Sequence, residues 1–178
     1  MHRSTVKFLL FVLILISAPA VYGQAEVTRE KTRERLNALL QREGPGMNVS
    51  FRQSEKNPFS FSGTLKDGLK NAESMEIVAV VSPKETIGLR IFPHYKGGYI
   101  NIDKVRNTTQ LLRQLVQFNS RTFLYWGADS DGDVFTGYTF TLESGFPDEA
   151  IKIVLASIKN SDQFVGELRP AIDGSTGQ

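Results

Sequence analysis

The chain has 178 residues, with 21 basic and 19 acidic side chains, a formal net charge of +2 and no cysteine. This length suffices for one ordinary hydrophobic core, and no repeat, low-complexity tract or linker indicates a second domain. The missing cysteine excludes disulfides, cysteine-ligated zinc and a lipid attached to an N-terminal cysteine.

The first residues have the pattern of a secretory signal peptide. Arg3 and Lys7 form a basic start, an unbroken apolar segment follows at Phe8–Ile16, and small residues end it. A membrane-spanning helix needs roughly 20 apolar residues, so the pattern favours a cleaved leader over a permanent anchor. We therefore expect an exported protein, periplasmic or secreted, without stable membrane insertion after cleavage.

Cleavage can follow Ala20, Gly23 or Ala25, and we favour Gly23, which makes residues 1–23 the leader. Loss of the two basic residues of the leader leaves 19 of the 21 basic side chains against 19 acidic ones, a net charge of zero. Nucleic-acid binding depends on a surplus of Lys and Arg that displaces phosphate counterions. The mature composition therefore argues against a nucleic-acid partner.

One domain is expected over residues 24–172, followed by a disordered tail at Asp173–Gln178. The first element is a helix at Thr28–Glu43, because Thr28 can cap it and Gly44 can end it. The apolar residues of this helix fall only in its C-terminal half. Alternating or continuous apolar residues then predict extended segments at 47–51, 59–61, 75–82, 86–92 and 99–102.

A second helix is predicted at Thr108–Ser120, with Asn107 or Thr108 as its cap and apolar residues on one face. A last helix starts after Gly145, has a polar break at 160–163 and ends at Pro170. The order of helix, several strands, helix, two strands and helix predicts an α+β fold. We expect a largely antiparallel sheet with the helices packed on it.

The clearest local signal is a β-hairpin formed by residues 122–128 and 134–143. The dipeptide Asp131-Gly132 predicts a two-residue type I′ turn, which fixes the residues that lie opposite each other. It pairs Phe123 with Phe140 and Tyr125 with Tyr138 on one surface. On the other surface it pairs Trp126 with Gly137 and Ala128 with Phe135, so that Trp126 forms a flat apolar site. The candidate partner-binding residues are Trp126, Phe135, Tyr125 and Tyr138.

Three aspartates at the tip of this hairpin, Asp129, Asp131 and Asp133, resemble the start of an EF-hand calcium loop. Such a loop needs Gly at its sixth position and Glu at its twelfth, whereas this chain has Val134 and Phe140 there. The aspartates are therefore interpreted as turn residues, with calcium binding as a weak alternative. No other metal site and no cofactor is predicted.

His94 is the only histidine of the mature chain, and neither a nucleophile motif nor a phosphate-binding loop accompanies it. The sequence thus predicts a protein that is not an enzyme. A second hypothesis is a small-ligand site in a concavity between the sheet and the helices, with polar contacts from His94 or Tyr95.

The C-terminal part of the chain resembles the YbjN family of bacterial domains. The resemblance rests on a helix that ends in Phe118-Asn119, an aromatic strand, an Asp-rich turn, a second strand, and a helix that runs to Leu168. In the same order, the residues that carry it are 111–118, 123–126, 129–133, 143–146 and 164–168. It implies the order α-β-β-β-α-β-β-α of type III secretion chaperones. Proteins of that shape bind partner polypeptides, commonly as dimers, and have no catalytic residues.

The sequence therefore predicts an exported, non-enzymatic module of YbjN type. We expect it to recognise a protein partner through its sheet or hairpin face, and a homodimer is compatible with the resemblance.

Overall fold

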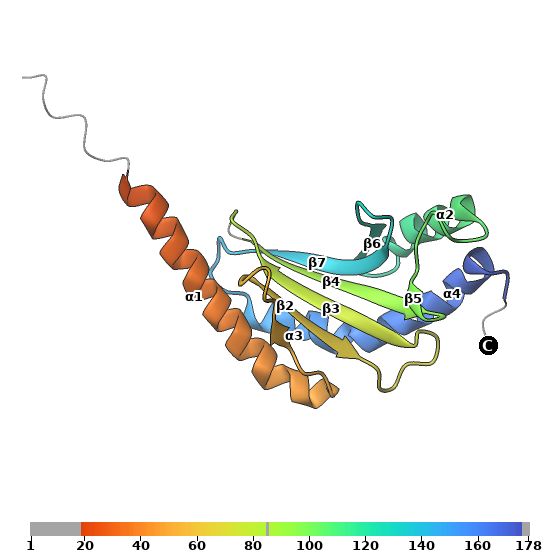
Figure 1. Cartoon of the computed structure of the whole chain (residues 1–178), viewed down its shortest axis with the longest axis horizontal. Coiled ribbons are helices and arrows are strands. Elements are labelled where there is room, and N and C mark those ends of the chain that lie inside the picture. Colours follow the sequence, from red (N-terminus) through yellow and green to blue (C-terminus); the bar gives the residue numbers. More distant parts are fainter. Residues whose placement is uncertain (1–18, 85, 176–178) are drawn as a thin grey trace, which may run out of the picture.

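The computed structural model describes residues 19–84 and 86–175, with side chains from residue 28 onward. It consists of one sheet and a set of helices (Figure 1). The helices are α1 (Pro19–Glu43), α2 (Thr108–Phe118), α3 (Asp148–Ser157) and α4 (Asp162–Ile172), with short 3₁₀ helices η1 (Gly44–Met47) and η2 (Ile158–Ser161). The strands are β1 (Arg52–Gln53), β2 (Ser60–Leu65), β3 (Ser74–Val81), β4 (Thr86–Tyr95), β5 (Gly98–Tyr99), β6 (Tyr125–Ala128) and β7 (Val134–Thr141).

The sheet has the order β1-β2-β3-β4-β7-β6, with β5 paired to β4, and its strand pairs are antiparallel. The predicted α+β class with a largely antiparallel sheet is therefore confirmed. The predicted order α-β-β-β-α-β-β-α is recovered when the two-residue strands β1 and β5 are set aside and α3 and α4 are counted together. None of the described helices is long and apolar enough to cross a bilayer.

Both ends of the chain differ from the expectation. Residues 1–18 of the predicted leader lie outside the described residues, and α1 begins at Pro19, a favoured first helical residue, rather than at Thr28. At the other end, the side chain of Asp173 bonds to Tyr95 and Lys96, although the sequence predicts a disordered tail from Asp173 on. Residues 176–178 of that tail lie outside the described residues.

Two internal predictions also need correction. Helix α4 continues to Ile172 through Pro170, which the sequence predicts to be its end. Pro170 lies in the last turn of α4, where its missing N–H removes one helical hydrogen bond and the helix continues for two more residues. The segment 47–51 is not a strand: Met47 lies in η1, and Asn48 has a left-handed backbone (φ 55°) that interrupts extension.

The hydrophobic core lies between one face of the sheet and the helices. In β3 and β4 every second residue is apolar and fully buried: Ile77, Ala79, Val81, Ile87, Leu89 and Ile91. The apolar stripes of α1, α2, α3 and α4 join the same cluster. In Figure 1 the strands lie in front of α3 and α4, so the helices cover one face of the sheet and leave the other uncovered.

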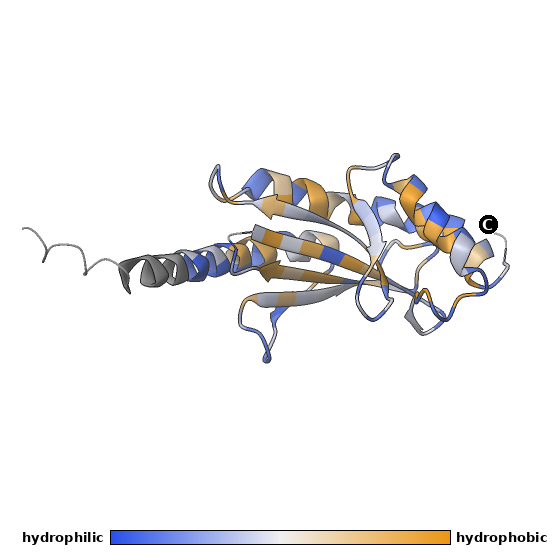
Figure 2. Cartoon of the chain, turned by 90° about the horizontal axis from the view of Figure 1, so that it is seen from above, coloured by the Kyte–Doolittle hydropathy of each residue, from blue (hydrophilic) through white to orange (hydrophobic). Residues whose placement is uncertain are grey.

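Helix α1 is attached to the end of the sheet by an arginine. The guanidinium of Arg29 lies 3.5 Å from the ring centre of Phe59 and donates to the carbonyl oxygen of Val81 at 3.0 Å. In Figure 2 the coloured part of α1 is hydrophilic where it is farthest from the strands, and hydrophobic residues appear where the helix reaches them. The charged half of α1 is therefore only partly solvated, because Arg29 binds the sheet.

A buried carboxylate holds the loop between β2 and β3 against α4. Asp162 is 5% exposed, and its two oxygens accept the backbone N–H groups of Lys70, Asn71 and Ala72 at 2.7–3.1 Å. Gly166 on the next turn allows this close approach, since a Cβ there would lie 2.7 Å from the side-chain oxygen of Asn71. Burial of this carboxylate is tolerable because the three backbone N–H groups and the side-chain amide of Asn71, at 3.2 Å, replace its water.

The free edge of β6 is occupied by a side chain instead of a strand. Asn119, at the end of α2, accepts the backbone N–H of Trp126 at 2.6 Å and donates to its carbonyl oxygen at 3.3 Å. One amide thereby satisfies both backbone groups that Trp126 turns away from β7.

We predict that Asp162→Ala lowers the free energy of unfolding by about 3 kcal/mol, because one buried and two half-buried backbone donors lose their acceptor. Asp162→Asn, which keeps one oxygen, should lose less. Chemical denaturation measures both, with Gln163→Ala at the exposed neighbouring position as control. A loss below about 0.5 kcal/mol for Asp162→Ala, within the range of ordinary surface substitutions, would contradict this role.

Candidate functional site: the open face of the sheet

The β6–β7 hairpin has a register one residue away from the predicted one. Tyr125 lies opposite Gly137, Trp126 opposite Thr136, and Gly127 opposite Phe135. The loop contains three residues rather than two: Gly132 has a φ of 81° and follows a turn closed by Asp129 and Asp133, whose backbones hydrogen bond at 3.0 Å. A shift by one residue gives each residue of β6 a different partner in β7, so the residues predicted to lie opposite each other do not do so.

Trp126 is part of the core and not of an exposed patch, so this prediction is wrong. Its side chain is 4% exposed, and its ring lies 5.4 Å from that of Phe118 on α2 and 5.6 Å from that of Phe164 on α4. Its neighbour across the hairpin is Thr136, which is buried as well. The aromatic character of β6 therefore serves the contact between the sheet and two helices.

The two tyrosines that were expected to face each other lie on opposite faces of the hairpin. Tyr138 pairs with Leu89 and thus points to the helix side, where it is 37% exposed beside Phe123. Tyr125 pairs with Gly137 and points to the uncovered side, where it is 36% exposed. Of the four predicted partner-binding residues, only Tyr125 and Phe135 share this uncovered surface.

We name this surface, the side of the sheet opposite α3 and α4, the open face. A continuous line of five rings crosses it from β6 to β5, and we name this line the aromatic row. Successive ring centres are 5.6, 5.6, 5.9 and 4.4 Å apart. Its members in spatial order are Tyr125, Phe135, Phe92, Tyr99 and His94.

An arginine packs beside the aromatic row. The guanidinium of Arg90 lies 4.7 Å from the ring centre of Phe135, a distance typical of a cation–π contact. Phe135 is therefore only 6% exposed although no described helix covers it. Arg90 and Phe92 alternate with the buried Leu89 and Ile91, and this alternation was the sequence signal that could have placed them on one face.

The end of the aromatic row at β5 is polar. The hydroxyl of Tyr99 donates to the carboxylate of Glu76, and this hydrogen bond, with partial burial, raises the pKa of Tyr99 to about 12. The Nε2 atom of His94 is buried, lies 3.9 Å from the same carboxylate and has no hydrogen-bond partner among the described residues. Glu76 is therefore already engaged within the protein.

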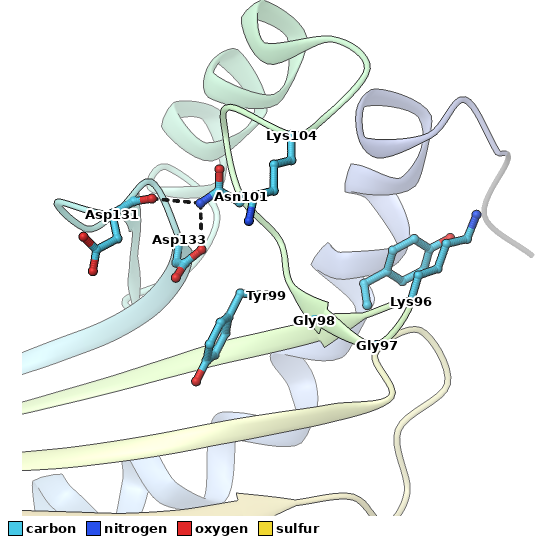
Figure 3. A pocket seen from close by; sticks show the side chains of 9 residues that line it. Lys96, Gly97, Gly98, Tyr99, Asn101, Lys104, Asp131 and Asp133 are labelled. Carbon is cyan, nitrogen blue, oxygen red and sulfur yellow. Dashed lines mark hydrogen bonds between the residues drawn. The ribbon is translucent and has the colours of Figure 1, made fainter.

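A shallow pocket of about 510 Å³ opens beside Tyr99, at the tip of the hairpin (Figure 3). Its lining residues are Tyr95, Lys96, Gly97, Gly98, Tyr99, Asn101, Lys104, Asp131 and Asp133. His94 does not line it, although Tyr99, its partner in the pairing of β4 with β5, does. Tyr95 instead donates to Asp173 at 3.0 Å, while the ammonium group of Lys96, 2.6 Å from Asp173, keeps the pKa of that carboxyl well below its usual range. Of the two residues predicted to contribute to a small-ligand site, His94 or Tyr95, only Tyr95 lines this pocket.

The tip aspartates build the turn. Asp129 accepts the backbone N–H groups of Asp131 and Asp133 at 3.0 and 2.9 Å, and Asp133 accepts the side-chain amide of Asn101 at 2.8 Å. Figure 3 shows that amide between the backbone of Asp131 and the side chain of Asp133. Among the described residues, no group of three or more His, Asp or Glu side chains is arranged to hold a metal ion.

These observations define an α+β protein with one helix-covered and one uncovered sheet face. No family model and no curated protein matches the chain. Among solved structures, the crystal structure of the ExsC–ExsE complex is similar, with a TM-score of 0.45 and 14% sequence identity over 76% of this chain and 94% of that chain. The fold class rests on the strand pairing described above and not on this similarity.

We predict that Trp126→Ala lowers the free energy of unfolding by about 3–5 kcal/mol, because it leaves a cavity between β6, α2 and α4. Tyr125→Ala, the adjacent residue on the other face, should cost less than about 1 kcal/mol. Denaturation followed by circular dichroism compares the two variants. Equal losses would mean that the register is not the one described.

We further predict that the phenol of Tyr99 titrates near pH 12 in the folded protein. The titration is measured as phenolate absorbance, and this component should be absent from the Tyr99→Phe variant. Because the pKa in the folded state exceeds the ordinary value of 10.0, the hydrogen bond stabilises the fold fully below pH 10 and loses this effect as the pH rises toward 12. Glu76→Gln should return the titration toward pH 10. Glu55→Gln, an exposed control, should leave it unchanged.

Proposed function

We propose that this chain is an exported, non-enzymatic module that binds a partner polypeptide through the open face of its sheet. The aromatic row is the observation that carries the proposal, because it lies on the one sheet face that the described helices leave uncovered. Exposed groups of aromatic residues of this kind mark interaction surfaces in soluble proteins.

The composition of the open face is typical of a protein interface. Aromatic residues and arginine are enriched in such interfaces, and a few of them usually supply most of the binding energy. Tyr125, Phe92 and Tyr99 expose ring surface, while Arg90 offers donors beside them. The antiparallel sheet fixes their backbone positions, so little conformational entropy is lost when a partner binds.

Export and the absence of catalysis belong to the same proposal and rest on the sequence. The basic and apolar leader supports export, and the lack of a nucleophile motif around His94 supports a binding role. The resemblance of residues 111–168 to YbjN domains, with their chaperone-like shape, supports a polypeptide as the partner. A second copy of the chain is one form that this partner can take.

The pocket beside Tyr99 favours a second candidate function, the binding of a small ligand. Lys104 and Asp133 line it together with Gly97 and Gly98. A ligand that binds the native state raises the melting temperature by mass action. A thermal-shift screen with small metabolites, repeated with Lys104→Ala, tests this candidate.

We predict that Phe92→Ser reduces capture of a partner from the cell envelope. The Kd of the complex with that partner should rise roughly thirtyfold, equivalent to about 2 kcal/mol. Tyr125→Ser should act in the same direction. The measurement is quantitative co-purification with the wild-type chain as bait, followed by titration of the purified partner.

Val116→Ser and Ile153→Ser are the matched controls, because both residues are exposed and apolar but lie on helices α2 and α3. The proposal fails if these controls lose the partner while the open-face variants retain it.

A further inference from the structure

Two arginines of the open face lie in one line across the sheet. The strand register places Arg52, Ser62, Val78, Arg90, Gly137 and Tyr125 directly opposite one another, from β1 to β6. Residues directly opposite in adjacent strands share a face, so all six point to the open face. We name this line the arginine row; it crosses the strands and meets the aromatic row at Tyr125.

The charges of the arginine row are uncompensated. Neither Arg52 nor Arg90 has an ion pair or a hydrogen bond from its side chain among the described residues, and both residues are exposed. Most other described arginines are engaged with carboxylates or carbonyl oxygens: Arg29, Arg33, Arg35, Arg42, Arg121 and Arg169. Glu76, the acidic residue among the strand positions of the open face, is bonded to Tyr99.

From this charge distribution we infer that the open face binds an acidic polypeptide segment, with one carboxylate on Arg52 and another on Arg90. The inference rests on the proposed function and specifies the chemistry of its partner. Guanidinium groups bind carboxylates with two parallel hydrogen bonds, and the cation–π contact with Phe135 holds the guanidinium of Arg90 in place before binding.

The geometry also limits the spacing of the two acidic residues. The arginines are three strand steps apart, which is about 14 Å at roughly 4.8 Å per step. An extended segment that crosses the strands advances about 3.3 Å per residue, so its acidic residues lie about four positions apart. Ser62 and Val78 form the floor between the arginines, and an apolar residue of the segment packs on Val78.

A polypeptide fits this surface better than a phosphate polymer or a membrane. Nucleic acids and anionic membranes are bound through larger groups of cations, typically four or more. The arginine row has two cations, flanked by Val78 and the aromatic rings of Phe92 and Tyr125. The mature chain expected after leader cleavage has no surplus of positive charge. The surface therefore combines two point charges with an apolar area.

Photo-crosslinking in the cell of origin tests this inference. The full chain carries benzoylphenylalanine in place of Ser62, and the crosslinked segment is mapped by mass spectrometry. We expect a polypeptide adduct whose mapped segment has two Asp or Glu residues about four positions apart. A synthetic peptide of that segment should bind the wild-type protein on the order of tenfold more tightly than its Asn/Gln counterpart.

Arg52→Gln and Arg90→Gln should each weaken binding of the acidic peptide about tenfold, and Arg90→Lys should weaken it less because it keeps the charge. Arg113→Gln on α2, an exposed arginine without a described side-chain partner, is the matched control and should bind normally. Unfolding curves of all variants show whether a loss of binding comes from a loss of structure.

The outcomes separate this inference from the proposed function. A polypeptide adduct whose segment lacks acidic residues, or whose peptide binds both glutamine variants as tightly as the wild type, overturns the inference and leaves protein binding at the open face intact. A nucleic-acid or lipid adduct overturns both. The absence of any adduct at Ser62, with adducts at a control position such as Ile153, also overturns both.

Discussion

The packing of the described helices against one side of an antiparallel sheet is the constraint on which the rest of this structure depends. It is set by the alternation in β3 and β4, where residues such as Ile77 and Leu89 are completely buried and their neighbours Val78 and Arg90 point the other way. Burial of one face supplies the core, since each large apolar side chain contributes about 1.5–3 kcal/mol. The other face is then free to have a composition that packing alone would not select, and it carries rings and unpaired guanidinium groups.

Much of this architecture could be predicted from the sequence because the signals are local. The apolar periodicity of α2 and the cap at Asn107 set that helix, and the continuous apolar segment of β3 set the centre of the sheet. The sequence also predicts the hairpin, but it does not predict the observed register. Asp131-Gly132 fits a two-residue turn and a three-residue loop almost equally well, and the side chain of Asp129 decides between them by accepting two backbone N–H groups.

The candidate site could be predicted only in part, for a different reason. The alternation of Arg90 and Phe92 with buried neighbours assigns them to one face, yet no local pattern says which face the helices leave bare. That depends on contacts between distant segments, such as Asp162 with the loop at residues 70–72 and Arg29 with the end of β3. Each of these is a charged residue whose partner is a backbone group, and backbone groups have no sequence signature.

The amide of Asn119 has a consequence for how copies of this protein behave toward each other. The chain has a formal net charge of only +2, so charge repulsion between its copies is weak. One of the two edges of its sheet is the terminal strand β6, where the strand of another chain could add. Because Asn119 already bonds the backbone N–H and C=O of Trp126, the side chain of Asn119 blocks strand addition at this position of β6 without any added charge or proline.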